Sequence, residues 1–311
     1  MKTYVIGHKK PDTDSIAAAI GYAFIKNIEG IKAIPARAGP LNLETQYALN
    51  KFRVEPPQLV TNAKGCKLIL VDHNEPEQIV DGFKDAEIVE ILDHHRLGGL
   101  VTPQPIRVYI EPVGSTSTLV AKIAFEKGIK LSKELAGILL SAIISDTVIF
   151  KSPTCTDEDR AIAEELSRIA GVDDITAYGI ELFKAKSAIS SKKPEEIILG
   201  DFKEYDFSGI RVGIGQAETV DLTELEARRD ELLEAMKKIC NERNYNMLIL
   251  MLTDIIKEGS LVLYVTDKDA WFKEAFSKYR MEPQGRNSVY IAGLISRKKQ
   301  VVPLLEKYFS T

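Results

Sequence analysis

The stretch ILDHHRLGG (Ile91–Gly99) carries an apolar, strand-like run directly into an aspartate, two adjacent histidines and an arginine. The whole chain contains only four histidines. Two of them side by side at the end of a buried strand therefore indicate either chance or a place where an ion binds. The segments around this stretch decide the fold, and the other two histidines decide between these two interpretations.

Strand-like and helix-like segments alternate through the first half of the chain. The strand-like segments are TYVIG, IKAIPAR, KLILVD and EIVEILD, and the helix-like ones are SIAAAIGYAFIKNI, ETQYALNKF and PEQIVDGF. Ser15 is the predicted N-cap of the first helix. This rhythm predicts βαβ units and a mainly parallel sheet. From Ser117 to Ile189 the spacing of apolar residues predicts a succession of helices.

The polar stretch SSKKP, residues 190–194, is the predicted linker between two domains. Beyond it, residues 196–220 carry turn signals spaced as in a hairpin, and residues 222–244 have helical spacing. MLILMLTDII and SLVLYVT follow as strands. The sequence therefore predicts an α/β protein. Residues 1–189 form a parallel-sheet domain with flanking helices, and residues 195–311 form a smaller domain with a mixed sheet.

Composition limits the class of protein. The 311 residues are 45% hydrophobic and 28% charged, with a net charge of −4, which is typical of globular proteins and unfavourable for general nucleic-acid binding. No apolar run reaches the roughly 18 residues of a membrane span, and the N-terminus lacks a signal-peptide pattern. Three dispersed cysteines without a CxxC motif favour a reducing cytoplasm over a disulfide framework or thiolate zinc site.

All four histidines follow predicted strands, and each has an aspartate close by. They are His8 with Asp12 and Asp14, His73 with Asp72, and His94 and His95 with Asp93; Asp146 ends a further apolar stretch. Any one of these motifs is commonly a cap or turn, and DTDS alone fits an N-cap. Because ligands bind beyond the carboxyl ends of strands in open parallel sheets, the full set predicts one polar site.

Imidazole and carboxylate without thiolate suit Mn²⁺, Co²⁺, Fe²⁺ or Zn²⁺, whereas Mg²⁺ prefers oxygen ligands and water. Two histidines and four aspartates can hold two divalent ions about 3.5–4 Å apart. Four carboxylates balance the four positive charges, so that a water between the ions ionises near neutral pH. The composition of this site therefore predicts phosphoryl chemistry.

Several motifs together resemble a known superfamily. GHKKPDTDS, LVDHNE, DHH and the ISDT around Asp146 occur in the order found in DHH phosphoesterases. SRKKQVVPLL (Ser296–Leu305) resembles the C-terminal signature of the manganese-dependent, family II inorganic pyrophosphatases. GDFKEYDF is similar to the segment that carries that family's phosphate-binding lysine. The resemblance covers essentially the whole chain.

The resemblance implies a role for each polar residue. His8 and Asp12 would bind one metal, Asp14 and His94 the other, with Asp72 and Asp146 bridging both. His95 would face the substrate, donating a hydrogen bond or proton, while Asp93, His73 and Asn74 orient the neighbouring groups. Lys203, Arg297 and Lys298 would bind the phosphates from the second domain, which places the expected active site between the domains. Without the metal set, SRKK would be interpreted as a solvated cationic run.

The implied activity is hydrolysis of inorganic pyrophosphate by a metal-bridging hydroxide in a cytoplasmic homodimer. Its implied cofactors are two Mn²⁺ or Co²⁺ per subunit, with additional Mg²⁺ arriving with the substrate. The resemblance assigns no role to Lys9, Lys10 or Lys299, and GSTST (residues 114–118) is expected to start a helix, its hydroxyls being less favoured as phosphate contacts.

Two alternatives stay open. Exopolyphosphatases and oligonucleotide or cyclic-dinucleotide phosphodiesterases of the same superfamily need a basic groove or stacking aromatics, and only 7% of the residues here are aromatic. A catalytically silent protein that retains the metal site is the other alternative.

Overall fold

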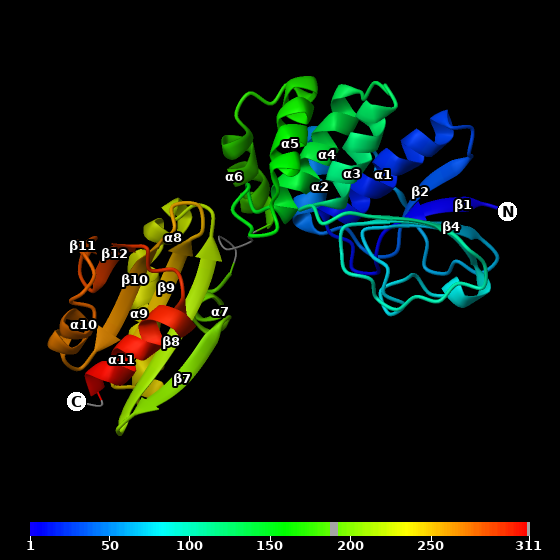
Figure 1. Cartoon of the computed structure of the whole chain (residues 1–311). Coiled ribbons are helices and arrows are strands. Elements are labelled where there is room, and N and C mark those ends of the chain that lie inside the picture. The colour runs from blue at the N-terminus through cyan, green and yellow to red at the C-terminus, as the bar shows by residue number, and fades with distance from the viewer. Residues whose placement is uncertain (187–191, 310–311) are drawn as a thin grey trace. The chain divides into compact units, whose positions relative to one another are not determined.

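The computed structural model describes residues 1–186 and 192–309, which belong to two compact units, Met1–Lys186 and Ser187–Thr311 (Figure 1). The predicted linker, residues 190–194, begins outside the described residues and ends where helix α7 (Pro194–Leu199) begins. Within the described part of the chain, no helix is both long and apolar enough to cross a membrane.

The first unit is built on a sheet of six strands that are all parallel, as predicted. The strands lie in the order β3-β2-β1-β4-β5-β6, so the direction of the chain across the sheet reverses between β1 and β4. Their bounds are β1 (Thr3–Ile6), β2 (Ala33–Arg37), β3 (Gln58–Leu59), β4 (Lys67–Val71), β5 (Glu87–Asp93) and β6 (Arg107–Ile110). β3 and β6 were not predicted; they are short edge strands with little apolar periodicity.

The two central crossovers cover opposite faces of this sheet. Helix α1 (Thr13–Ile28) joins β1 to β2, whereas the connection from β4 to β5 runs toward the other edge. Because such crossovers are right-handed, a reversed direction places them on opposite faces. Accordingly Ile79 and Val80, from the β4–β5 connection, pack in one cluster with Ile6 and Leu70.

The helix predicted at PEQIVDGF is wrong. This connection consists of turns that end in a short 3₁₀ helix, η1 (Phe83–Asp85). Gly82, which precedes it, has a left-handed conformation with φ 76°, and the side chain of Asn62 occupies the place of a Cβ there. Residues 79 and 80 are both fully buried, so the turn still covers the sheet.

The predicted helices of the first unit are otherwise present. They are α2 (Leu43–Lys51), α3 (Thr116–Glu126), α4 (Lys133–Asp146), α5 (Asp157–Ala170) and α6 (Ile175–Lys186); the predicted continuation of α6 over residues 187–189 lies outside the described residues. α1 contacts both α3 and α4, and Figure 1 shows α3, α4 and α5 side by side. α4 is buried along most of its length, which matches its continuous apolar composition.

Helix α1 begins earlier than predicted. Its N-cap is Asp12, whose side chain accepts a hydrogen bond from the backbone N–H of Ser15 at 2.9 Å. Ser15 is therefore inside the helix, fully buried, and its hydroxyl is available to another group. The group that caps the start of α1 is therefore the carboxylate of Asp12 and not the hydroxyl of Ser15.

The second unit contains a mixed sheet of six strands in the order β11-β12-β10-β9-β8-β7. β8 and β9 are parallel and the other neighbours are antiparallel, which confirms the mixed sheet and the predicted β7–β8 hairpin. The bounds are β7 (Phe202–Phe207), β8 (Ile210–Thr219), β9 (Met247–Asp254), β10 (Gly259–Thr266), β11 (Glu282–Pro283) and β12 (Ser288–Ala292). Residues 196–199, expected in the hairpin region, belong to α7 instead, which begins at the last residue of the predicted linker.

Helices cover both faces of this second sheet. Along β9, Leu248 and Leu250 pack in a cluster with α7 and α9, while Met247 and Ile249 pack in a cluster with α10 and α11. This alternation follows from the two-residue period of a strand whose faces are both buried. The remaining helices are α8 (Thr223–Ala227), α9 (Arg229–Glu242), α10 (Asp269–Ala275) and α11 (Val302–Phe309). The predicted single helix over residues 222–244 is thus two helices.

Candidate metal centre

The polar residues of the first unit meet beyond the carboxyl ends of its central strands. His8 follows β1, Asp72 follows β4, and His94 follows β5. β1 and β4 are the neighbouring strands at which the sheet order reverses, and their outgoing connections diverge to opposite faces. This divergence opens the crevice in which α/β sheets bind ligands. The predicted rim therefore exists, and the topology places it between β1 and β4.

Three overlapping groups of side chains at this rim are close enough to hold metal ions. In each group the potential ligand atoms lie within 4.8 Å of one another, and Asp72 belongs to all three. The groups are His8, Asp12 and Asp72; Asp14, Asp72, His94 and Asp146; and Asp72, His94 and His95. All six residues predicted as metal ligands are thus brought together, although they come from segments spread over more than 130 residues.

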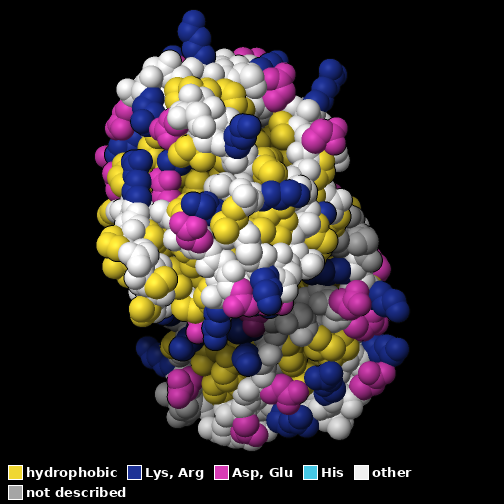
Figure 2. Space-filling view, turned by 90° about the vertical axis from the view of Figure 1, so that its right-hand side faces the viewer, with side chains coloured by type: hydrophobic (Ala, Val, Ile, Leu, Met, Phe, Trp, Pro, Cys, Tyr) yellow, Lys and Arg dark blue, Asp and Glu magenta, His cyan; other side chains and the backbone are white. Residues whose placement is uncertain are grey.

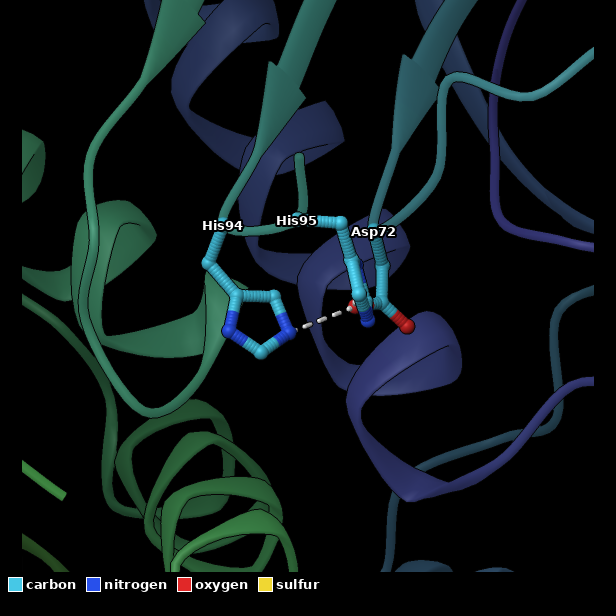
Figure 3. Close-up of side chains that lie close together, drawn as sticks. All are labelled: Asp72, His94 and His95. Atoms are coloured by element: carbon cyan, nitrogen blue, oxygen red, sulfur yellow. Dashed lines mark ion pairs between the residues drawn. The ribbon is translucent and has the colours of Figure 1, made fainter. Parts of the chain in front are cut away.

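The two oxygens of Asp72 face different histidines. His8 Nε2 lies 3.5 Å from Asp72 Oδ2 and 3.6 Å from Asp12 Oδ2. On the other side, His94 Nε2 lies 3.5 Å from Asp72 Oδ1, as Figure 3 shows, and 3.9 Å from Asp146 Oδ2. This is the arrangement of a carboxylate that bridges two ions. Asp146 belongs to the group that contains His94.

Asp72 is held in an unusual backbone conformation. Its φ of 64° lies in the left-handed region, which aspartate tolerates better than most residues. Ser15 Oγ donates to Oδ2 at 2.8 Å, and Thr116 Oγ1 donates to Oδ1 at 3.3 Å. The buried carboxylate is therefore fixed from two sides, by helices α1 and α3.

Asp14 is bound by the N-terminus of α3. The backbone N–H of Thr116 donates to its Oδ2 at 2.6 Å, and Ser117 N–H and Ser115 Oγ both donate to its Oδ1 at 2.9 Å. Because a helix N-terminus carries partial positive charge, these contacts stabilise a carboxylate that is fully buried. The GSTST segment thus starts a helix, as expected.

Three hydroxyls of this segment, those of Ser115, Thr116 and Thr118, donate to carboxylates, whereas the buried Ser117 Oγ makes no hydrogen bond to the described residues. Besides the contacts already described, Thr118 Oγ1 donates to the buried Asp159 at 2.6 Å, and Asp159 also accepts the N–H of Gly114. Residues 115–118 are all inaccessible to solvent. The less favoured interpretation, in which these hydroxyls contact phosphate, is therefore not supported.

Backbone carbonyls orient two of the imidazoles. His94 Nδ1 lies 3.0 Å from Val113 O, and only a protonated nitrogen can make this contact. Its Nε2, the nitrogen that a metal ion would bind, is consequently directed toward the carboxylates. His73 Nδ1 makes the equivalent contact with Val71 O at 2.9 Å, but His73 lies outside the three groups, in agreement with a supporting role.

Asp93 positions the ring of His95, whose second nitrogen, unlike that of His94, is open to another molecule. Its Nδ1 lies 2.9 Å from Asp93 Oδ1, and the same oxygen accepts the backbone N–H of both histidines. Asn74 donates to the other oxygen of Asp93 at 2.6 Å and binds the backbone of Arg96 and Gly98. This leaves Nε2 of a half-exposed ring for another molecule, since Nδ1 is already used.

The shifted pKa values of this cluster indicate an excess of negative charge. Although burial opposes it, contact with Asp12 and Asp72 raises the pKa of His8 to about 10, and contact with Asp72 likewise raises that of His94 to about 9. Burial and the neighbouring Asp72 raise the pKa of Asp14 to about 7. In the described first unit the ion pairs of these carboxylates involve histidines rather than lysines or arginines. Divalent ions would replace these protons, so the donor set fits them.

One residue that links the ligand-bearing segments by hydrogen bonds was not predicted from the sequence. Glu44, on α2, accepts hydrogen bonds from Thr13 at 2.6 Å and Ser145 at 2.5 Å, and these flank the predicted ligands on α1 and α4. A single glutamate in an ordinary helix gives no signal of such a role.

The backbone conformation after α4 was not predicted either. Val148, Ile149 and Phe150 all have left-handed φ values, although their side chains favour extended structure.

The predicted phosphate-binding cations are gathered at one corner of the second unit. Lys203 is the second residue of β7, and Arg297 and Lys298 begin the π-helical turn η3 (Arg297–Val301). Arg297 donates to backbone oxygens of Asp201 and of Ile214, the residue opposite Lys203 in β8. Lys203 and Lys298 are exposed. Segments almost 100 residues apart are therefore adjacent in this unit.

Comparison with known proteins relates the whole chain to one family. Residues 2–143 match the DHH family, N-terminal domain, and residues 180–308 match the DHHA2 domain. A manganese-dependent inorganic pyrophosphatase of Methanothrix thermoacetophila is 48% identical over 307 residues, covering 98% of each chain. That of Bacillus subtilis is 43% identical over 306 residues, covering 98% of this chain and 97% of the relative.

A crystal structure of a Methanococcus jannaschii protein assigned to family II of inorganic pyrophosphatases superposes with a TM-score of 0.61. The two sequences are 44% identical, and the alignment covers 99% of this chain and all of the other. Both domains are therefore shared with relatives of the same length.

The two adjacent histidines should behave differently toward metal. We expect His94→Ala to weaken Mn²⁺ binding, because Nε2 of His94 lies within one ligand group whose other members are carboxylates. His95→Gln should leave Mn²⁺ binding unchanged, because Asp93 already occupies the nearer nitrogen. Isothermal titration of the metal-free protein with Mn²⁺ measures both. Loss of a metal site in His95→Gln together with a full complement in His94→Ala would reverse the assignment.

Proposed function

This chain belongs to the family of manganese-dependent inorganic pyrophosphatases, and we propose on that premise that it hydrolyses pyrophosphate to two orthophosphates at the metal centre described above. The observation that carries the proposal is Asp72, whose two oxygens face two separate sets of histidine and aspartate ligands. A bridged pair of ion positions suits phosphoryl transfer to water.

We assign His8, Asp12 and Asp72 to one ion, and Asp14, Asp72, His94 and Asp146 to the other. When bound, two divalent ions would lower the pKa of a water between them and neutralise the charge that develops on the phosphate oxygens. Mn²⁺ or Co²⁺ fits this mixture of imidazole and carboxylate better than Mg²⁺, which we expect to enter with the substrate. The chain's own contribution is to keep the carboxylates deprotonated and in place, through α3 and the hydroxyls of Ser15 and Thr116.

His95 is the proposed proton donor to the departing phosphate. Its hydrogen bond with Asp93 raises its pKa, so the ring is protonated at higher pH than a free imidazole. Asp93 also fixes the ring orientation, which leaves the Nε2 proton for the substrate. A positioned imidazolium of this kind is a general acid.

Lys203, Arg297 and Lys298 are the proposed phosphate ligands of the second unit. Pyrophosphate concentrates three to four negative charges, which guanidinium binds through paired donors and ammonium as a point charge. Their clustering at the β7–η3 corner supports a common anionic ligand. Together with the metals they would stabilise the charge of the transition state.

The other phosphoesterases of the superfamily are the main alternative. Longer or nucleotide substrates would need an extended basic or aromatic surface. The face that Figure 2 displays shows no histidine side chain, and lysine and arginine side chains are dispersed on it among acidic and apolar ones. Pyrophosphate is the better-supported substrate because the full-length relatives at 43–48% identity are manganese-dependent inorganic pyrophosphatases.

Two further assignments follow from the family rather than from the geometry. We propose that the protein acts in the cytoplasm, in keeping with its few, unpaired cysteines, and that it is a homodimer. Sedimentation of the purified protein measures the second assignment directly, because a single subunit has a mass of 34.6 kDa.

Removal of metal should abolish hydrolysis. After treatment with a chelator, we expect Mn²⁺ or Co²⁺ to restore phosphate release from pyrophosphate well beyond the level reached with Mg²⁺ alone, because the imidazoles disfavour Mg²⁺. Equal rates in Mg²⁺ buffer free of both metals would contradict this. Polyphosphate and a dinucleotide serve as comparison substrates, and preferential cleavage of either would replace the proposed activity with one of the alternatives.

His95→Gln should lower turnover without removing metal. The expected loss in kcat is about 10²–10⁴-fold, the usual contribution of a general acid. Steady-state phosphate release at saturating Mn²⁺ measures it. His73→Gln is the matched control, since that buried histidine lies next to the site without facing the proposed substrate, and a loss in the control of equal size would deny His95 a special role.

Removal of the proposed phosphate ligands should weaken catalysis without changing metal affinity. We expect Lys203→Ala or Lys298→Ala to reduce kcat/KM for pyrophosphate by about tenfold or more, the effect of losing one charge-assisted contact. Lys299→Ala is the control, because it removes the same charge from the adjacent exposed position. If Lys203→Ala and Lys298→Ala both retained wild-type kcat/KM, like the control, these lysines would be only surface charges.

A further inference from the structure

The guanidinium of Arg297 is bound on one edge by a single residue, Asp201. Its Nη1 donates to the backbone oxygen of Asp201 at 2.7 Å, and its Nη2 donates to Asp201 Oδ1 at 2.8 Å. A third, longer bond runs from Nη1 to Ile214 O at 3.3 Å. The Arg297 side chain is only 12% exposed, whereas that of Asp201 is 61% exposed. Asp201 therefore fixes the arginine at the surface of the second unit.

The donors that remain form a matched pair. An arginine has five N–H donors in a planar fork, and three are used by these contacts. Among the described residues, no hydrogen bond uses the Nε–H or the second hydrogen of Nη2, and these two lie parallel on the adjacent edge of the fork. Two parallel N–H groups are the donors that bind phosphate in a bidentate manner. Asp201 thus occupies one edge of the guanidinium and leaves the phosphate-binding edge open.

The backbone of Arg297 is fixed as well. Its N–H donates to Gln216 Oε1 at 3.2 Å, and Gln216 Nε2 donates to Ile295 O at 3.0 Å and to Thr253 Oγ1 at 3.2 Å. Gln216 lies on β8 and Thr253 on β9, so the turn that carries Arg297 is tied to the centre of the sheet. A side chain held at both ends loses little freedom when it binds a ligand.

We propose that Asp201 is a positioning residue that pre-orients Arg297 for the substrate phosphate. Asp201 directly precedes β7 and lies two residues before Lys203, so the same contact also ties the strand that carries Lys203 to the turn that carries Arg297 and Lys298. The inference rests on the phosphate-binding role proposed for Arg297. It adds an acidic residue to a proposed phosphate-binding site, although the negative charge of that residue would repel the phosphate.

The opposite role for Asp201 is competition with phosphate for the guanidinium. The geometry argues against it, because the carboxylate and the phosphate would use different edges of the fork. Asparagine distinguishes the two roles. Its Oδ1 can still accept the Nη2 hydrogen bond and so retain the orientation, while the negative charge that would compete is removed.

The test compares Asp201→Ala, Asp201→Asn, Arg297→Ala and the double variant Asp201→Ala/Arg297→Ala in the full chain. We expect Asp201→Ala to raise the KM for pyrophosphate by about tenfold, the effect of losing a charge-assisted hydrogen bond, with Mn²⁺ binding unchanged. Asp201→Asn should stay within about threefold of the wild type. The double variant should be no more impaired than Arg297→Ala, because Asp201 acts through that arginine.

Glu204→Ala is the matched control. Glu204 lies on β7, the strand that Asp201 precedes, and its ion pairs within the described chain are with other arginines, at 3.8 Å from Arg211 and 3.5 Å from Arg243. It should leave KM unchanged. A lower KM in Asp201→Ala or Asp201→Asn would overturn the proposal in favour of competition, and an unchanged KM in Asp201→Ala would also overturn it. Wild-type kinetics in Arg297→Ala would instead remove the phosphate role of Arg297 itself, and this inference with it.

Discussion

The carboxylate of Asp72 is the group on which the rest of the metal centre depends. Each of its oxygens faces a different histidine, and every potential metal-holding group includes it. Two carboxylates about 4 Å apart repel by about 4 kcal/mol at an effective dielectric constant near 20, so a cluster of four is unstable without compensation. The raised pKa values of His8 and Asp14 reflect this concentration of negative charge in a buried site. Divalent ions provide the compensation in the proposed active form.

The surrounding fold keeps this repulsive cluster together with groups that carry no net positive charge. The N-terminus of α3 binds Asp14, hydroxyls of Ser15 and Thr116 bind Asp72, and backbone carbonyls orient the ring of His94. A lysine or arginine in these positions would neutralise the carboxylates and compete with metal. Dipoles and hydroxyls hold the ligands without competing, and this explains why the site is built from helix ends and serines rather than from ion pairs.

The second unit differs from the first in that cationic side chains lie on its neighbouring segments. Its exposed Lys203 and Lys298 lie on the segments that meet at Arg297, which is held in place by oxygens of Asp201 and Ile214 together with the carboxamide of Gln216. The two units are thus complementary in chemistry. One holds carboxylates in need of cations, and the other holds cations in need of an anion, which is consistent with a metal–pyrophosphate substrate.

Local sequence determined the two-domain α/β class, the four histidines at strand ends and the predicted ligand set, because strand periodicity and the residues after each strand are local features. It failed where the backbone conformation depends on distant atoms. The β4–β5 connection has an apolar pattern compatible with a helix but forms turns against the sheet, and Val148, Ile149 and Phe150 have left-handed conformations that their side chains disfavour. Only the tertiary structure decided that Asp72 faces both histidines, that Glu44 joins the ligand-bearing helices, and that Asp201 binds Arg297. Those contacts link residues up to about 100 positions apart, and their geometry depends on the packing of whole elements, which no local pattern encodes.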